Sequence, residues 1–159
     1  MVEREIEIMK RALVLLVIGG AAMAQISPNA PKDQPVSVTD TQLAAMDTAI
    51  APYVKQARQT YPSAKARYLQ GLPQGQIFFV TIALKDAKGK SERVFMRVLD
   101  IKGSAISGRI ASPILLVEGF KNGQAYSTDE ADVMDWLIAK SDGTEEGNVI
   151  GKFLDTYHP

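Results

Sequence analysis

The sequence predicts an α+β fold, in which an antiparallel sheet of about five strands has an N-terminal helical segment and a C-terminal helix packed on it. Three observations support this fold class. Apolar residues recur every three or four positions at the beginning of residues 38–159, and they do so again at the end. Between these stretches, short apolar runs separated by Gly-containing turns predict consecutive strands. We expect residues 38–159 to form a single domain.

The first helical segment is expected to begin at Thr39 or Asp40, because both residue types cap helices well. Its apolar positions are Leu43, Met46, Ile50, Tyr53, Val54, Ala57 and Tyr61. Pro52 removes one backbone donor, so a kink or a restart is expected there. The residue before a proline avoids the helical conformation, and the segment should therefore end at Pro62. Residues 63–70 then suit a short second helix.

The middle of the chain predicts a series of strands. Residues 77–84 have apolar side chains at both alternating sets of positions, which indicates an inner strand partly covered on both faces. A polar loop containing Gly89 leads to the partner strand, residues 93–101, and a third strand is expected at 105–111. Residues 114–117 form a short apolar run that we expect to be buried.

The last part of the chain predicts an edge strand at 124–128, a single helical turn at 129–134 and a returning strand at 136–139. Thr144 is expected to cap the last helix, with Glu145 and Glu146 in its first turn, where acidic residues are favourable. The apolar face of this helix comprises Val149, Ile150, Phe153, Leu154 and Tyr157.

The composition excludes several classes of function. The chain has 159 residues, no Cys and one His. Without Cys there is no disulfide framework, thiolate zinc site or cysteine nucleophile. The single His158, next to the last residue, leaves little material for a catalytic triad or a histidine metal site. With 18 Lys+Arg against 18 Asp+Glu, the chain does not resemble a cationic nucleic-acid binder. We predict no cofactor and no nucleic-acid partner.

The charge is nevertheless uneven along the chain. Residues 55–109 carry eleven Lys or Arg against three Asp or Glu, whereas residues 110–159 carry three against nine. In one interpretation these two parts neutralise each other across solvated faces. In the other, a basic face on the first hairpin meets an anionic partner, such as an envelope polymer or lipid headgroups.

The N-terminal residues predict export. Lys10 and Arg11 precede an uncharged, mostly apolar run at 12–24, and a small–x–small triplet stands before Gln25. This is the pattern of a cleaved secretory signal. The run of 13 residues is shorter than the roughly 18 that a membrane-spanning helix needs. We expect a periplasmic or secreted protein with no transmembrane span after cleavage.

On this reading, residues 1–24 are an N-terminal extension plus the signal peptide, and residues 25–37 are a flexible, proline-containing leader. Three Glu precede Met9, where a signal peptide favours positive charge, so the true start is predicted to be Met9. The alternative is an amphipathic N-terminal segment that stays attached.

Several short stretches carry a family resemblance. They are Ala57-Arg58-Gln59-Thr60-Tyr61-Pro62, Gly71-Leu72-Pro73, Phe78-Phe79-Val80, Asp135-Trp136 and Asp142-Gly143-Thr144-Glu145-Glu146-Gly147-Asn148. With this spacing, residues 45–156 resemble the bacterial domain of unknown function numbered 2314, the YegJ-like group. The resemblance implies a compact bacterial domain that is often exported, and it brings no accepted activity.

Asp135-Trp136 is the first candidate for a ligand- or partner-binding site. In one reading, Trp136 stacks on a ligand in a shallow groove while Asp135 orients that ligand. In the other, Trp136 is a core residue whose ring N–H finds a buried acceptor, and Asp135 caps the adjacent turn.

A second candidate lies in the acidic turn that follows. Asp142, Glu145, Glu146 and Asn148 offer four oxygen-bearing side chains within seven residues, which is the ligand chemistry that calcium prefers. The spacing does not match an EF-hand loop, and a turn followed by a helix cap explains the same residues. We therefore predict no metal site and keep these four residues as the weak alternative.

These observations predict a non-catalytic binding or interaction domain of the cell envelope, with an envelope protein or an anionic envelope component as its partner. The alternative is a carboxylate-dependent hydrolase acting on an envelope polymer, with Asp135 and Glu118 as its acidic residues. A third reading is a purely structural accessory subunit.

Overall fold

The computed structural model describes residues 40–157. The predicted signal peptide, leader and start site, together with the Thr39 cap and His158, lie outside the described residues. The elements follow in the order α2 (Asp40–Gln70), β1 (Ile77–Lys85), β2 (Ser91–Lys102), β3 (Ala105–Ile110), β4 (Ala125–Asp129), the 3-10 helix η1 (Glu130–Asp132), β5 (Asp135–Ala139), β6 (Glu145–Gly147) and α3 (Val149–Leu154).

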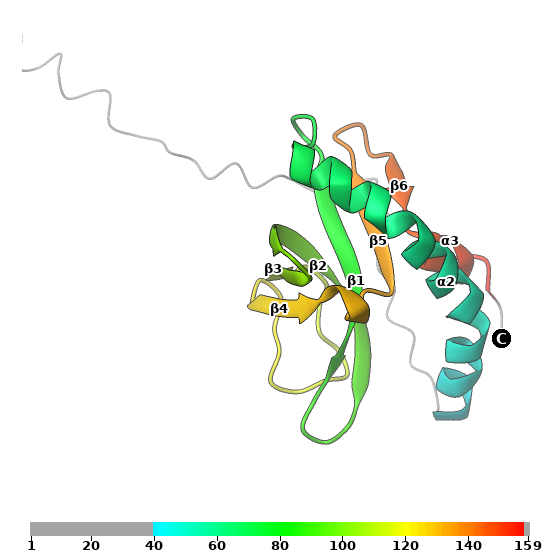
Figure 1. Cartoon of the computed structure of the whole chain (residues 1–159). Coiled ribbons are helices and arrows are strands. Elements are labelled where there is room, and N and C mark those ends of the chain that lie inside the picture. The colour runs from blue at the N-terminus through cyan, green and yellow to red at the C-terminus, as the bar shows by residue number, and fades with distance from the viewer. Residues whose placement is uncertain (1–39, 158–159) are drawn as a thin grey trace, which may run out of the picture.

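The strands form one antiparallel sheet in the order β4-β3-β2-β1-β5-β6 (Figure 1). The α+β class, with helices at both ends of the chain, is therefore confirmed. The sheet has six strands rather than about five, because residues 145–147 pair with β5. Long β1 lies inside the sheet, with β2 on one side and β5 on the other.

The sheet is curled rather than flat. β4 and β5 are four strand positions apart, which would be about 19 Å in a flat sheet. Only residues 130–134 connect them, and these include the compact turn η1. The connection is bonded at both ends, because Glu130 N–H donates to Ser104 O at 2.8 Å and Met134 N–H donates to Thr81 O at 2.9 Å. Such a short link brings the two strands together only if the sheet curves around its core.

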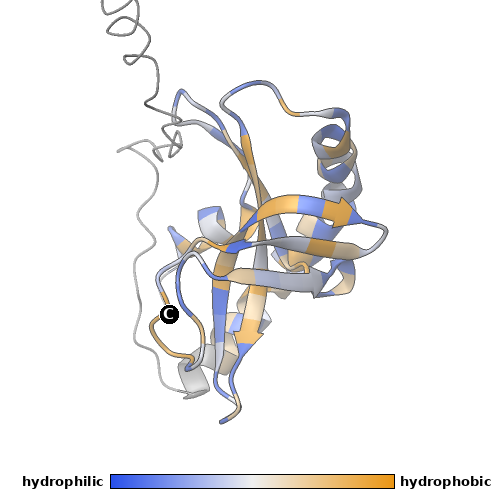
Figure 2. Cartoon of the chain, turned by 90° about the vertical axis from the view of Figure 1, so that its left-hand side faces the viewer, coloured by the Kyte–Doolittle hydropathy of each residue, from blue (hydrophilic) through white to orange (hydrophobic). Residues whose placement is uncertain are grey.

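The main core lies on one face of the sheet, where alternate residues of β1 and β2 point inward. Figure 2 shows hydrophobic (orange) stretches along the strands of the sheet. These inward residues are Phe78, Val80, Ile82, Leu84, Val94, Met96 and Val98. From α2, Tyr61, Ala64 and Tyr68 pack on them, with the rings of Tyr68 and Phe78 5.3 Å apart.

Five further buried apolar residues lie outside this cluster, namely Ile50, Ala57, Phe79, Leu137 and Ile150. They come from α2, from α3 and from the strands β1 and β5. Tyr53 of α2 stacks on Phe153 of α3 with ring centroids 4.3 Å apart. The C-terminal helix is therefore held against both the sheet and the first part of α2.

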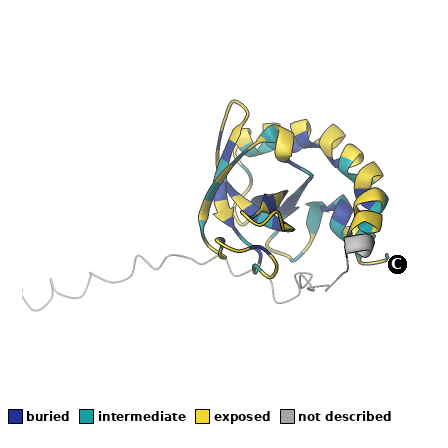
Figure 3. Ribbon diagram, turned by 90° about the horizontal axis from the view of Figure 1, so that it is seen from below, coloured by how far each residue is buried: buried dark blue, intermediate teal, exposed yellow. Residues whose placement is uncertain are grey.

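The predicted break at Pro62 is wrong, because Asp40–Gln70 is one helix that contains both Pro52 and Pro62. A proline removes only one helical donor, and the buried side chains of Tyr61 and Ala64 on either side of Pro62 hold this part of α2 on the sheet. The helix curves along its length, and its exposed residues lie along the outside of the curve (Figures 1 and 3). In residues 40–157, no helix is long and apolar enough to cross a membrane.

The predicted helix start at Thr144 is also wrong. Glu145–Gly147 form β6, and α3 begins at Val149 after Asn148, which has a φ of 53°. Pairing with β5 uses the backbone groups that a helical first turn would have needed. Gly147, with a φ of 77°, then changes the direction of the chain between strand and helix.

Candidate functional site

Two loops lie together at one end of the sheet, namely the turn between β1 and β2 and the long connection from β3 to β4 (Figure 1). Asp86 organises the first of these loops. Its Oδ1 accepts the backbone N–H groups of Lys88 at 2.8 Å and Lys90 at 2.9 Å. Gly89 completes the turn with a φ of 82°, a value that favours glycine.

The same carboxylate reaches the second loop, because Asp86 Oδ2 accepts the backbone N–H of Glu118 at 3.2 Å. Partial burial opposes ionisation, yet the three N–H donors from Glu118, Lys90 and Lys88 together hold the pKa of Asp86 below its usual value. The ionised carboxylate of Asp86 therefore joins the two loops through hydrogen bonds to both.

Glu92 anchors the second loop more deeply. This buried residue of β2 accepts three consecutive backbone N–H groups, those of Leu115 (2.9 and 3.1 Å), Leu116 (2.8 Å) and Val117 (3.1 Å). A carboxylate surrounded by three N–H donors is well compensated for its burial, because each bond is charge-assisted. The loop is thus fixed through its backbone N–H groups.

We call residues 113–119 the leucine loop. Val117 is buried and Ile114 packs against the core, whereas Leu115 and Leu116 are 57% and 46% exposed. The expectation that all of residues 114–117 are buried is therefore wrong for the two leucines. Four hydrogen bonds from backbone N–H groups to Glu92 fix the loop in a conformation in which Ile114 and Val117 face the core. The two leucines between them face solvent.

Exposed lysines lie at the same end of the sheet as this loop. Lys85, Lys88 and Lys90 lie in or beside the β1–β2 turn, and Lys121 lies just beyond the loop. Lys88 Nζ pairs with Glu118 Oε1 at 2.7 Å, and both side chains are 63% exposed. This end of the protein therefore combines two adjacent exposed leucines with a cluster of basic groups.

Trp136, the predicted ligand-stacking residue, is half-buried beside the core. Its ring N–H donates to Thr60 Oγ1 of α2 at 2.9 Å. The ring lies so close to Gly147 of β6 that a Cβ at Gly147 would be 2.8 Å from Trp136 Cε3. Trp136 thus connects α2, β5 and β6.

Asp135 is 1% exposed, and both of its oxygens are occupied. Oδ1 accepts the N–H of Trp136 at 2.7 Å, and Oδ2 accepts the N–H of Ile150 in α3 at 2.7 Å. Burial raises the pKa of Asp135 to about 6, although these two backbone bonds oppose the increase. Asp135 therefore holds the start of α3.

Glu118, the predicted partner of Asp135 in a hydrolase, belongs to the other loop cluster. Thr81 is the strand partner of Asp135, whereas Glu118 contacts the turn that follows Lys85. Thr81 and Lys85 are four positions apart on β1, or about 13 Å. This exceeds the roughly 5–10 Å that separates the carboxyl groups of most glycosidases.

Two shallow hollows lie beside α2. One is lined by Ala51, Val54, Lys55, Arg58 and Gln59, and the other by Arg58, Tyr61, Glu130, Ala131 and Val133. Neither hollow includes Asp135 or Glu118, so neither provides a cleft around the predicted acidic pair.

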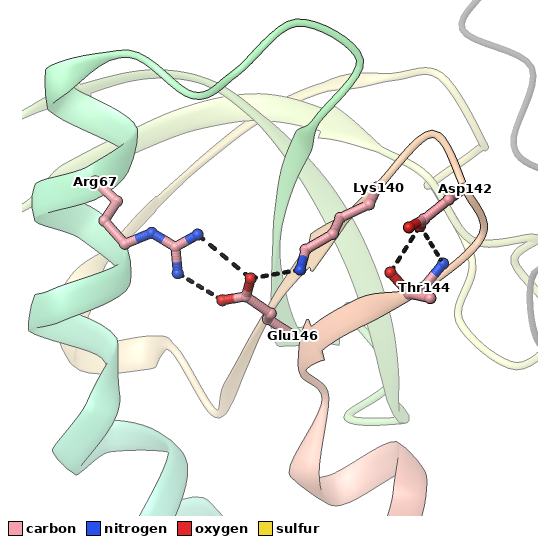
Figure 4. Close-up of polar contacts among 5 residues, drawn as sticks. All are labelled: Arg67, Lys140, Asp142, Thr144 and Glu146. Atoms are coloured by element: carbon pink, nitrogen blue, oxygen red, sulfur yellow. Dashed lines mark hydrogen bonds and ion pairs between the residues drawn. The ribbon is translucent and has the colours of Figure 1, made fainter.

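Two residues of the weak alternative cation site, Asp142 and Glu146, bond to different partners (Figure 4). Asp142 Oδ1 accepts the N–H and the hydroxyl of Thr144, at 2.9 and 2.7 Å. Glu146 pairs with Arg67 at 2.5 Å and Lys140 at 2.7 Å, and these hydrogen bonds, first that of Arg67, lower its pKa to about 2.

Glu145, the neighbour of Glu146 on β6, has a different environment. Its Oε1 accepts the side-chain amide of Asn148 at 2.9 Å. Successive strand residues point to opposite faces, so the two glutamates diverge. Among residues 40–157, no group of three or more His, Cys, Asp or Glu is placed to hold a metal ion.

The sequence predicts burial of residues 114–117 because all four are apolar, and this pattern gives no sign that two of them are exposed. One signal was available in the sequence: Pro113 and Gly119 bracket the run, and both residue types favour loops. The role of Glu92 gave no local signal, because its partners are more than twenty residues away.

Comparison with known proteins identifies one family. A family model described as "Uncharacterized protein conserved in bacteria (DUF2314)" matches residues 44–157, which include every strand and nearly all of the helices described above. No curated protein and no solved structure matches the chain.

Proposed function

The chain belongs to the DUF2314 family of uncharacterised bacterial proteins, and on this premise we propose that it is an exported, non-catalytic interaction domain of the cell envelope. It binds its partner through the leucine loop. The observation that carries this proposal is the exposure of Leu115 and Leu116 on a loop whose backbone is fixed by Glu92.

The energetics of the loop support a binding role. Isolated exposed leucines are common on protein surfaces, but two adjacent ones on an ordered loop gain free energy only when something covers them. Because the loop is already ordered, the binding free energy is not reduced by the conformational entropy lost on ordering it. The basic groups around it add attraction for an anionic partner.

The arrangement of the carboxylates favours binding over hydrolysis. Asp135 is buried with both oxygens bonded to backbone N–H groups. Glu118 pairs with Lys88 in the turn after Lys85, and Lys85 lies about 13 Å along β1 from Thr81, the strand partner of Asp135. Asp135 and Trp136 support this function indirectly, because they join β5 to both helices.

Photo-crosslinking tests the binding site. A photoreactive residue replaces Leu115 in the protein expressed in growing bacteria, and the control places it at Leu69 of α2, since both positions are 57% exposed. We expect covalent adducts from position 115 and few from position 69. Equal yields at both positions, or no adduct at position 115, would contradict the proposal.

Export is tested separately by sequencing the N-terminus of the protein recovered from the envelope fraction. The small–x–small triplet predicts a mature chain that begins at Gln25. Recovery of a protein that retains Met1 would show that this part of the proposal is wrong.

A further inference from the structure

We propose that the leucine loop docks on an anionic lipid surface, with Leu115 and Leu116 entering the interfacial region and the neighbouring lysines contacting the headgroups. This inference rests on the proposed function and names the partner of the same loop. Three properties of the loop lead to it, namely its backbone hydrogen bonds, its size and its charge.

The first property is that the N–H groups of residues 115–118 already have hydrogen-bond partners. Four consecutive N–H groups, from Leu115 to Glu118, donate to the carboxylates of Glu92 and Asp86. An irregular loop normally cannot enter an apolar phase, because its unpaired donors would lose their water. Here the donors keep their partners, so the leucine side chains can leave water without that cost.

The second property is the small size of the apolar patch. A stable protein interface buries about 800 Å² on each partner. The leucine loop offers two exposed leucines, and the other apolar residues of the loop, Ile114 and Val117, face the core. So small a patch suits insertion into a soft phase, which closes around each side chain, better than docking on a rigid protein surface.

The third property is the charge next to the leucines. Lys85, Lys88, Lys90 and Lys121 are all exposed. Against these four lysines, the two loops carry the carboxylates of Asp86 and Glu118, and the buried Glu92 adds a third, so the net charge here is +1 (4 − 3). Glu118 is paired with Lys88, so Lys85, Lys90 and Lys121 are the lysines that can contact headgroups. Apolar side chains flanked by lysines are attracted to bilayers that contain anionic lipids.

Co-sedimentation with vesicles tests this inference. The protein, in the form recovered from the bacterial envelope, is mixed with vesicles of phosphatidylcholine alone or of phosphatidylcholine with phosphatidylglycerol. We expect binding that requires phosphatidylglycerol and decreases with salt. Leu115→Ala combined with Leu116→Ala should weaken it roughly tenfold, because the buried apolar area is lost.

Two matched variants serve as controls. Leu69→Ala with Leu99→Ala removes two leucines of similar exposure elsewhere, and it should leave binding unchanged. Lys85→Glu with Lys90→Glu should abolish binding, whereas Lys55→Glu with Lys102→Glu makes the same change in net charge away from the loop and should reduce it only slightly. Emission from Trp136 confirms that each variant is folded.

The outcomes separate this inference from the proposed function. Absence of phosphatidylglycerol-dependent binding, or equal losses in the loop variants and their controls, would overturn the lipid inference. If position 115 nevertheless crosslinks to a protein or a polymer, the interaction function stands with a different partner. If neither vesicles nor crosslinks report binding at the loop, both are wrong.

Discussion

The carboxylate of Asp135 accepts the backbone N–H of Ile150 at 2.7 Å, and this bond ties the first residue of β5 to the first turn of α3. The side chain is almost completely buried, and its pKa is raised to about 6 from 3.8. A structural bond is therefore made by a group that changes its charge near neutral pH.

This pKa predicts how stability depends on pH. The folded state binds the Asp135 proton more tightly than the unfolded state, so the contribution of this group is greatest below pH 3.8 and decreases as the pH rises toward 6. Between pH 5 and pH 7 the expected loss is about 1 kcal/mol. Chemical denaturation of the wild type and of Asp135→Asn over this range measures it. An equally steep dependence in Asp135→Asn would contradict the assignment.

Glu92 is predicted to control the order of the leucine loop. In Glu92→Gln, an NH₂ group replaces one carboxylate oxygen and cannot accept the N–H groups of Leu116 and Val117. We expect the free energy of unfolding to decrease by about 1–3 kcal/mol. Hydrogen exchange at the amides of residues 115–117 should accelerate more than exchange in β1.

Glu118→Gln is the matched control for this experiment, because the side chain of Glu118 pairs only with Lys88, at the surface, and its backbone bond to Asp86 is unaffected. It should leave exchange in the loop close to that of the wild type. Unchanged protection of residues 115–117 in Glu92→Gln would refute the anchoring role.

Gly147 is predicted to be the least replaceable glycine of the β6 turn. A Cβ there would lie 2.2 Å from Trp136 O and 2.8 Å from its ring. Gly147→Ala should therefore destabilise the protein by several times more than Gly89→Ala. Gly89 shares a positive φ but has open space around it. Thermal unfolding followed by Trp136 emission compares the two variants, and similar melting temperatures would show that the contact is not tight.

Glu146 is predicted to titrate abnormally low. Its pKa of about 2, from 4.5, comes mainly from the Arg67 hydrogen bond and secondly from Lys140. Arg67→Met should raise this pKa toward 4.5, and NMR titration of the carboxyl carbon measures the change. Because the pair is partly exposed, we expect Arg67→Met to lower the free energy of unfolding by less than about 1 kcal/mol. This loss is complete above pH 4.5 and fades as the pH falls toward 2. A wild-type pKa near 4.5 would contradict the ion pair.

The sheet was predictable because local patterns agreed with global packing. The continuous apolar run at residues 77–84 and the apolar residues at 93–101 marked β1 and β2, which lie side by side with Val80 opposite Met96. The polar loop containing Gly89 marked the end of the first strand and the start of the second. Each feature depends on neighbours in the sequence, and single-sequence reasoning can find it.

What could not be predicted depends on contacts between distant residues. Pro62 should have ended α2, but the burial of Tyr61 and Ala64 against the sheet outweighs the loss of one helical donor. Thr144 looked like a helix cap, but pairing of residues 145–147 with β5 outcompetes a first helical turn. Leu115 and Leu116 face outward because of Glu92, a partner more than twenty residues earlier.

The order of the strands has a consequence for synthesis. β1 receives its second partner, β5, only after fifty further residues have been made. Until then the nascent chain presents a long, apolar strand with one open edge, which is a template for association with other chains. A translation product truncated before Asp135 would keep that edge permanently. The strand that protects the centre of the sheet is therefore made well after the strand that it covers.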